Sequence, residues 1–329
     1  MRISEENSAK VVNLSFLCMI FACMVHVRWN VSTEVGRALV YLFKYVICAV
    51  CIPFFFVVSG FFLARHFGEP GWWKTAIRKR IGSLLVPYCA WQFINAFVWF
   101  AIEHRWTLRP GAFGLNPFIW PKLVPLWYLR ALMIFVAASP LLFWILKRWG
   151  RGFLAVAFAA NLVVGAFSAM GMIPERSPVG GLVYYTFSVL GVFYFSLGAW
   201  LAMHPMTLSR RIGNWCGAAA LVLIVVQMTI YCLGIVIPFD FRDLLLPVLM
   251  AFLWTHTPST RLPGFLAQAI FPIYLMHVIV YDIMENVVFK GQTFGNLPEL
   301  VSGVVCAIVV SALLHRFLPR VARVLFGGR

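Results

Sequence analysis

Runs of apolar residues recur along almost the whole chain and constrain its fold more than any other feature of the sequence. About ten of them approach 20 residues, the length that a helix needs to cross the hydrocarbon core of a bilayer. A helix satisfies its own backbone hydrogen bonds, which lipid cannot do. We therefore expect an all-α polytopic membrane protein, a bundle of about ten transmembrane helices. The approximate spans are 11–27, 39–64, 84–102, 124–146, 153–172, 182–203, 215–237, 244–254, 265–287 and 300–318.

Two of these spans are unusual in length. The span at 39–64 is too long for one straight helix, and Pro53 within it predicts a kink because proline has no backbone N–H to donate. The span at 244–254 is short, and we expect it to extend back through Phe239. The first span follows a charged segment and lacks a small-residue cleavage site, so we expect a retained helix and one domain over residues 1–329.

The composition excludes a soluble globular enzyme. Hydrophobic residues make up 62% of the chain and charged residues 12%, whereas an ordinary soluble domain is about half apolar and about a quarter charged. The eight cysteines lie in apolar runs, where a thiol packs as a small hydrophobe. Cys48 and Cys51 form a C-x-x-C, but no second Cys/His pair lies nearby, so we expect no metal site.

The formal net charge of +16 has its origin in membrane topology and does not indicate a nucleic-acid partner. Lys and Arg collect between alternate spans, as they do on the cytoplasmic side of a membrane. With this assignment both termini are cytoplasmic, and most acidic residues outside the first 70 positions lie on or near the outer side. The lipid bilayer itself is therefore an expected partner.

Ionisable side chains within membrane spans are candidates for function, because each costs at least about 2.5 kcal/mol to insert. Four stand out: His26, Lys44, Arg130 and His277. A neutral imidazole can take a proton from a hydroxyl group near neutral pH, so His26 is a candidate general base, and His277 is a further candidate catalytic residue. The alternatives are an interfacial histidine at His26 and a buried hydrogen bond at His277.

Arg130 and Lys44 are cations within the spans, and either one is a candidate for stabilising the oxyanion of a reaction intermediate. These side chains could equally extend toward the interface or pair with Asp282, Glu285 or Asp243. On the inner side, Arg78, Lys79 and Arg80 form a basic run. This run either marks topology only or binds the phosphates of a cytosolic donor such as coenzyme A.

Several segments, in this order along the chain, resemble the acyltransferase family 3 membrane proteins of bacteria, which acylate surface glycans. Each segment alone is a weak signal, and together they are fairly specific. The matching segments are Met24-Val25-His26, Pro53 through Leu63, Arg80 through Leu85 with Pro87 and Tyr88, Pro125 through Leu132, and Ile273 through His277.

The resemblance implies a ten-helix enzyme that takes an acyl group from cytosolic acyl-coenzyme A. It implies that His26 is catalytic, that Ser59, Gly60 and Phe61 line or shape the acyl path, and that Arg80 contributes to donor binding. Ser59 and Gly60, being small, would leave room for the pantetheine arm. Two positions depart from the family pattern, because Ser15 and Ser83 stand where basic residues are usual.

We therefore expect an O-acyltransferase of the bacterial inner membrane, most readily an O-acetyltransferase that uses acetyl-CoA as co-substrate and a sugar hydroxyl of a surface or lipid-linked glycan as acceptor. Direct transfer is favoured, since no cysteine suits a covalent intermediate. One alternative is a transporter or flippase for a sugar or an anion, although no internal duplication is seen. Another is a non-catalytic partner of glycan-assembly proteins. A homodimer is also compatible with the sequence.

Overall fold

A computed structural model describes residues 3–103, 125–173, 183, 189–235, 237, 239–289 and 296–328. Within these residues the chain is helical and contains no strand. Eight helical runs are long and apolar enough to cross a membrane. Two shorter helices, α10 (Val189–Met203) and α12 (Arg242–His256), coincide with the remaining two expected spans. The predicted all-α membrane bundle is confirmed.

The eight long runs include single helices and composites of consecutive helical segments. The single helices are α1 (Glu5–His26), α7 (Leu126–Trp149), α8 (Arg151–Ala169), α11 (Arg210–Cys232) and α14 (Asn296–Phe317). The composites are α2 (Glu34–Val40), η1 (Tyr41–Ile47), η2 (Cys48–Val50) and α3 (Cys51–Ala64), then α4 (Trp72–Arg80), η3 (Ile81–Leu85) and α5 (Val86–Glu103), and α13 (Gly264–Ile283) with η5 (Met284–Val288). A short helix, α15 (Pro319–Phe326), follows α14.

Helix α1 begins and ends at positions that its sequence specifies. The Ser4 side chain caps the first turn by accepting a hydrogen bond from the Asn7 amide at 3.2 Å. Glu5 and Glu6 in that turn favour the positive end of the helix dipole. His26 is the last helical residue, and Val27 has extended backbone angles. The candidate base therefore lies where the chain leaves the helix.

The long second span is irregular near its middle, as predicted. It remains one continuous run from Glu34 to Ala64, but a π-helical and a 3-10 segment come just before Pro53. A proline cannot donate to the carbonyl four residues earlier, which is here that of Ala49, so regular α-helical bonding is interrupted at this point. The irregular turns place Lys44 and Ala49 beside the cavity described below.

The start of α12 differs from our prediction. We expected this helix to extend back through Phe239, but it begins at Arg242. Phe239 and Asp240 lie outside the helix, and the Asp240 carboxylate accepts a hydrogen bond from the Arg242 amide at 3.0 Å. The expectation of a longer helix is therefore wrong.

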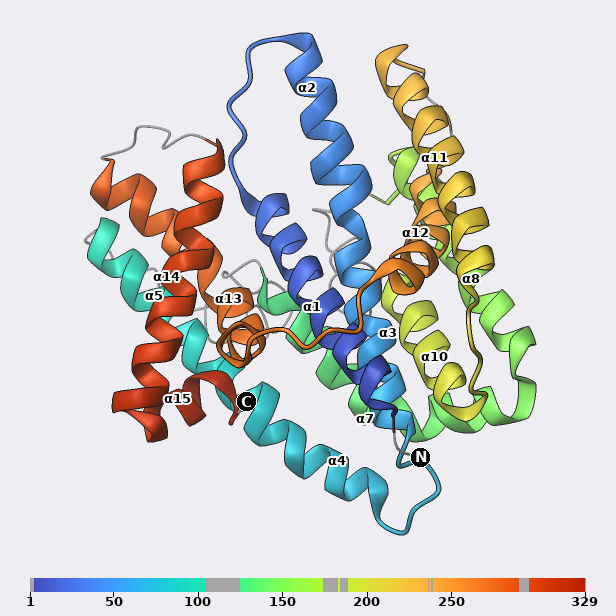
Figure 1. Cartoon of the computed structure of the whole chain (residues 1–329), viewed down its shortest axis with the longest axis horizontal. Coiled ribbons are helices and arrows are strands. Elements are labelled where there is room, and N and C mark those ends of the chain that lie inside the picture. Colours follow the sequence, from blue (N-terminus) through green and yellow to red (C-terminus); the bar gives the residue numbers. More distant parts are fainter. Residues whose placement is uncertain are drawn as a thin grey trace.

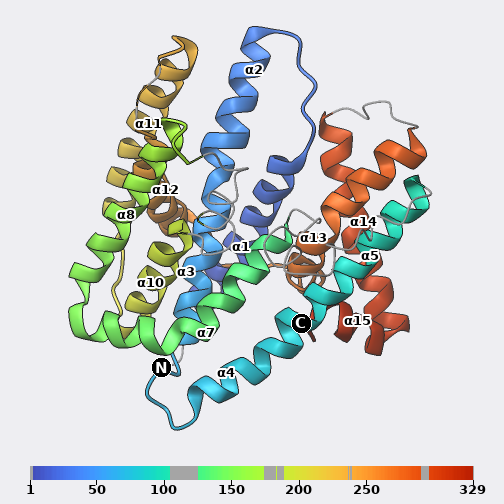
Figure 2. The ribbon, with the colours of Figure 1, turned by 180° about the vertical axis from the view of Figure 1, so that it is seen from behind.

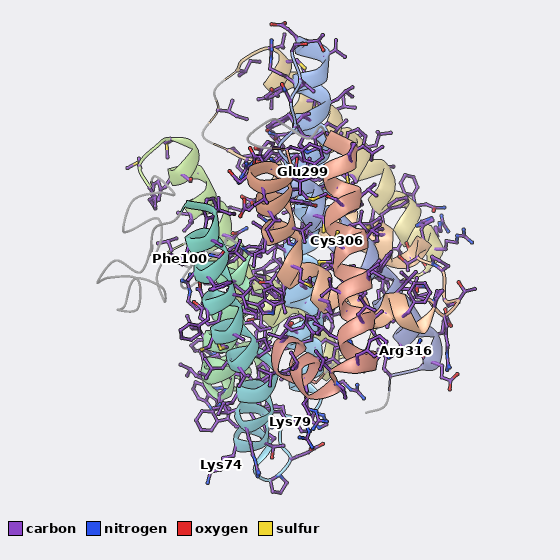
Figure 3. The ribbon with its side chains drawn as sticks, turned by 90° about the vertical axis from the view of Figure 1, so that its left-hand side faces the viewer. Lys74, Lys79, Phe100, Glu299, Cys306 and Arg316 are labelled. Atoms are coloured by element: carbon purple, nitrogen blue, oxygen red, sulfur yellow. The ribbon has the colours of Figure 1, made fainter. Side chains whose placement is uncertain are left out.

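Both ends of the chain, together with α4 and α15, lie at the same end of the bundle (Figures 1 and 2). Figure 3 places Lys74 and Lys79 at this end and Glu299 toward the opposite one. We call the end that carries α4, α15 and the termini the basic end. Helix α7 lies close to α4 there, since the Trp73 indole donates a hydrogen bond to the Val136 carbonyl at 3.3 Å.

The core of the bundle is the contact between α3 and α10, and glycines make it possible. A Cβ atom on Gly60 would overlap the backbone carbonyl of Phe195, and a Cβ on Gly198 would overlap that of Val57. The two backbones therefore approach each other as closely as small residues allow in a membrane interface. Phe56 and Phe195 are fully buried beside this contact.

Candidate functional site

A cavity of about 460 Å³ lies between α1, the η1–α3 run, α7, α8, α12 and α13. Its walls are largely apolar and aromatic, with a small number of polar side chains, as in most small-molecule sites. Both candidate histidines line it, and so does Lys44. The sequence singled out these three residues on three separate spans, and the fold brings them to one cavity.

The rings of His26 and His277 are neighbours, with their centroids 5.2 Å apart and their planes tilted by 45°. His277 is fully buried, and its Nδ1 lies 2.8 Å from the Ile273 carbonyl oxygen. Because a carbonyl oxygen only accepts hydrogen bonds, Nδ1 carries the proton and Nε2 of the neutral ring is the acceptor. Within the described ranges, no side chain or backbone group hydrogen-bonds to this Nε2.

The residues after His26 are bound to three neighbouring helical runs, those of η1, α14 and α13–η5. The Val27 carbonyl accepts a hydrogen bond from Lys44 Nζ at 3.1 Å. The Arg28 amide donates to Glu299 Oε2 at 3.2 Å, and its guanidinium lies 3.1 Å from Asp282 Oδ1. The same guanidinium pairs with Glu285. Asp282 of α13 and Glu285 of η5 thus both pair with Arg28, a residue that the sequence did not mark as a candidate.

Arg28 is expected to stabilise the fold at the end of α1. Its replacement by glutamine would leave Asp282, which is 7% exposed, and Glu285 without the guanidinium that pairs with both. We expect the free energy of unfolding to fall by about 2 kcal/mol, the value of a hydrogen bond to a charged group. Thermal unfolding in detergent measures this. Arg37→Gln is the control, since Arg37 pairs with Glu34 on the surface; equal shifts in the two variants would contradict the prediction.

Tyr128 connects the cavity to the residues expected at the donor side. Its ring lines the cavity, and its hydroxyl lies 3.2 Å from Ser59 Oγ, within hydrogen-bonding distance. Arg80, at the end of α4, is close enough to Tyr128 for an electrostatic interaction. A cation of the basic end therefore interacts electrostatically with a residue that lines the histidine cavity.

The remaining candidates occupy different surroundings. Arg130 is buried, with 3% of its surface exposed, and interacts electrostatically with Tyr88; the cavity lining does not include it. Arg78 and Lys79 are exposed on α4. Gly60 faces α10 and Phe61 packs edge to face on Phe62, so the small size of Gly60 serves helix packing.

Further polar residues of the cavity come from α8 and from the beginning of α12. They are Asn161, Ser168, Asp240, Arg242 and Asp243. Sequence reasoning named Asp243 only as a possible ion-pair partner and did not single out Asn161. An amide in the middle of an apolar span is a signal that could have identified it. Over the described ranges, no group of three or more His, Cys, Asp or Glu side chains is arranged to hold a metal ion.

Comparison with protein families gives one match, to the acyltransferase family 3 model, described as an acyltransferase domain, over residues 14–316. The chain belongs to this family. The match spans nearly the whole described bundle and includes both cavity histidines, so the protein is a membrane acyltransferase. Neither the curated proteins nor the solved structures contain a match.

The two positions that depart from the family pattern lie apart from the cavity lining. Ser15 is on α1, a half-buried position. Ser83 packs against the C-terminal segment, because a Cβ on Gly327 would lie 2.7 Å from the Ser83 Cα. The segment that covers Ser83 follows α15, whose Arg320 and Arg323 are exposed.

Proposed function

We propose that this membrane acyltransferase is an O-acyltransferase, most readily an O-acetyltransferase, which moves the acyl group of acyl-coenzyme A to a sugar hydroxyl of a surface or lipid-linked glycan. The observation that carries the proposal is the pair of neighbouring rings of His26 and His277 in one cavity, whose Tyr128 interacts electrostatically with Arg80. A base, a cavity for the reacting groups and a phosphate-binding cation are the elements that acyl transfer from coenzyme A requires.

His26 acts as the general base in this proposal. Its ring takes the proton of the acceptor hydroxyl while the oxygen attacks the thioester carbonyl and forms a tetrahedral intermediate. The carbon–sulfur bond then breaks, and the imidazolium returns the proton to the departing thiolate of coenzyme A. His277 carries its proton on Nδ1 and lies beside His26, and its buried Nε2 is an acceptor without a partner among the described residues.

Lys44 is our candidate for stabilising the oxyanion. It lines the cavity, and its ammonium group has three donors, one of which is used on the Val27 carbonyl. Arg130 was the other candidate from sequence. Because Arg130 is not part of the cavity lining and lies near Tyr88, we assign it to electrostatic support of the α5–α7 contact.

The donor enters from the basic end in this scheme, and the acceptor from the opposite end. Arg78, Lys79 and Arg80 would bind the phosphates, and the pantetheine arm would reach the cavity past Tyr128. With the positive-inside assignment, the basic end is cytoplasmic and both termini lie in the cytoplasm of a bacterial inner membrane. Transfer to an outer acceptor would then need no separate carrier for the acyl group.

Radiolabelled acetyl-CoA tests the proposal on the purified protein in detergent. We expect thioester cleavage, with label recovered on added surface glycan. Uptake of a sugar or anion into proteoliposomes without thioester cleavage would instead support a transporter. Glycan acylation that persists unchanged in cells after His26 is replaced would support a non-catalytic partner of a glycan-assembly complex.

Arg80 is expected to affect donor binding selectively. Replacing it with glutamine removes a cation that interacts electrostatically with Tyr128 of the cavity lining, and we expect KM for acetyl-CoA to rise about tenfold, the effect of one charge-assisted hydrogen bond. Steady-state kinetics with varied acetyl-CoA measure this. Lys74→Gln is the control, because Lys74 is an exposed cation of the same helix. An unchanged KM in the Arg80 variant would place the phosphates elsewhere.

A further inference from the structure

The α8–α12 wall of the cavity has no role in the scheme above. We give this name to Asn161, Gly165, Asp240, Arg242 and Asp243, which line the same cavity as the two histidines. Asn161 is in the middle of α8, and the acidic residues are at the beginning of α12. Inserting a polar side chain into a membrane bundle costs free energy, so the presence of these side chains in the cavity requires an explanation.

The Asp243 carboxylate is held in a defined position. Asn161 is 5% exposed, and its Nδ2 donates to Asp243 Oδ1 at 3.3 Å. The other carboxylate oxygen rests against α8 at Gly165, because a Cβ on that glycine would lie 2.6 Å from Asp243 Oδ2. The hydrogen bond from Asn161 to Oδ1 and the close packing of Oδ2 against Gly165 therefore fix the orientation of the carboxylate.

Arg242, the cation of this wall, pairs with another acid, Asp240. Arg242 Nε donates to Asp240 Oδ2 at 2.6 Å, and its Nη1 donates to the Tyr45 carbonyl at 3.3 Å. Among the described residues, Asn161 is the donor that the structure places on the Asp243 side chain. Asp243 Oδ2 thus retains the capacity to accept hydrogen bonds from a molecule in the cavity.

We propose that Asp243, positioned by Asn161 and Gly165, binds the acceptor of the reaction through hydroxyl groups next to the one that is acylated. This inference rests on the proposed function and names the class of acceptor. A carboxylate accepts hydrogen bonds from sugar hydroxyls and repels a carboxylate on the ligand. The site therefore takes a neutral sugar and excludes acidic ones such as uronates.

The apolar surface of the cavity agrees with a sugar-sized ligand. Trp127 and Tyr45 line it together with Asp243. Rigid aromatic rings with a few placed polar groups fix the orientation of a small ligand. A site built to bind a hydroxyl also discriminates strongly against ligands that lack it, because the polar group would remain unpaired. Asp243 is accordingly a residue that determines acceptor specificity.

Two glycines of α8 provide a matched test. Gly165→Ala puts a methyl group against Asp243 Oδ2, which displaces a side-chain end and no backbone. Gly152→Ala is the control, because a Cβ there meets nothing within 4 Å. Asp243→Asn is the second test variant, as it keeps the shape of the side chain and removes its charge. Each variant is made in the full chain, and thermal unfolding in detergent confirms that it is folded.

Two readouts separate the acceptor site from the donor chemistry. The first is ester-linked acetate released by mild alkali from the surface glycan of cells that carry each variant, with mass spectrometry of the acylated residue. The second is slow hydrolysis of acetyl-CoA by the purified protein, with water as acceptor. We expect Gly165→Ala and Asp243→Asn to lower glycan acetate at least tenfold, to lower hydrolysis far less than glycan acetate, and the acylated sugar to be neutral.

Three results would overturn the inference. They are normal glycan acetate in both test variants, an acidic sugar as the acylated residue, and a parallel loss of hydrolysis and glycan acetate in variants that remain folded. The last result would place Asp243 in the donor chemistry. Failure of the unaltered protein to cleave acetyl-CoA or to acylate glycan would instead refute the proposed function itself, and the acceptor site with it.

Discussion

Replacement of His26 by alanine is expected to lower the rate of acyl transfer by about 10²- to 10⁴-fold, the usual contribution of a general base. The imidazole lies beside His277 in the cavity, at the end of α1. Removing it leaves the acceptor hydroxyl without a group to take its proton. Single-turnover transfer of label from acetyl-CoA to glycan measures the effect on chemistry apart from binding.

His204→Ala is the control for this prediction. His204 is exposed after the end of α10, and its Nδ1 lies 3.2 Å from the Trp200 carbonyl oxygen, so it resembles His277 in its local hydrogen bond but lies on the surface. We expect full activity from this variant. KM for acetyl-CoA should be nearly unchanged in His26→Ala, since the donor phosphates are bound elsewhere. A variant at His26 that keeps most of the activity would show that another group acts as the base.

The sequence predicted the helices, and it marked the two histidines as candidates, because lipid imposes strong constraints on both. A span in a bilayer must be apolar and close to 20 residues long, so its presence is evident from composition alone. An ionisable residue within such a span is costly, so His26 and His277 stood out against their neighbours. The two histidines line one cavity for the same reason, because polar side chains of a membrane bundle face its interior and avoid the lipid.

The partners of these residues could not be predicted in the same way. Arg28 lies just beyond the end of α1, where a charge costs little, so nothing in its neighbourhood marked it. Its pairing with Asp282 joins residues 254 positions apart, a relation that only the tertiary fold establishes. Asn161 and Asp243 meet for the same reason across 82 positions.

Gly60 illustrates a different limit of the sequence. Its small size was interpreted as space for the pantetheine arm, but the same property also suits a close contact between helices. The structure places Gly60 against the Phe195 carbonyl, and Gly198 against the Val57 carbonyl, so each glycine accommodates the backbone of the other helix. A glycine in a span is therefore ambiguous until the neighbouring helix is known.

Gly60→Ala is expected to have the largest effect on stability of the substitutions discussed. The added methyl group would overlap the backbone oxygen of Phe195, which no side-chain rotation can relieve. Helices α3 and α10 would have to separate along the contact that also buries Phe56 and Phe195. We expect a loss of about 3 kcal/mol, the upper part of the range for overpacked cores, seen as a lower midpoint of thermal unfolding in detergent.

Gly82→Ala is the matched control, since a Cβ at this exposed position in η3 meets nothing within 4 Å. We expect its unfolding midpoint to equal that of the unaltered protein. Gly198→Ala should reproduce the loss at Gly60, because its methyl group would overlap the Val57 backbone from the other side of the same contact. If Gly60→Ala instead unfolded normally but lost only affinity for acetyl-CoA, Gly60 would line the donor path and the close α3–α10 contact would be wrong. Stability and donor affinity therefore separate the packing role of this glycine from the role inferred for it in acyl transfer.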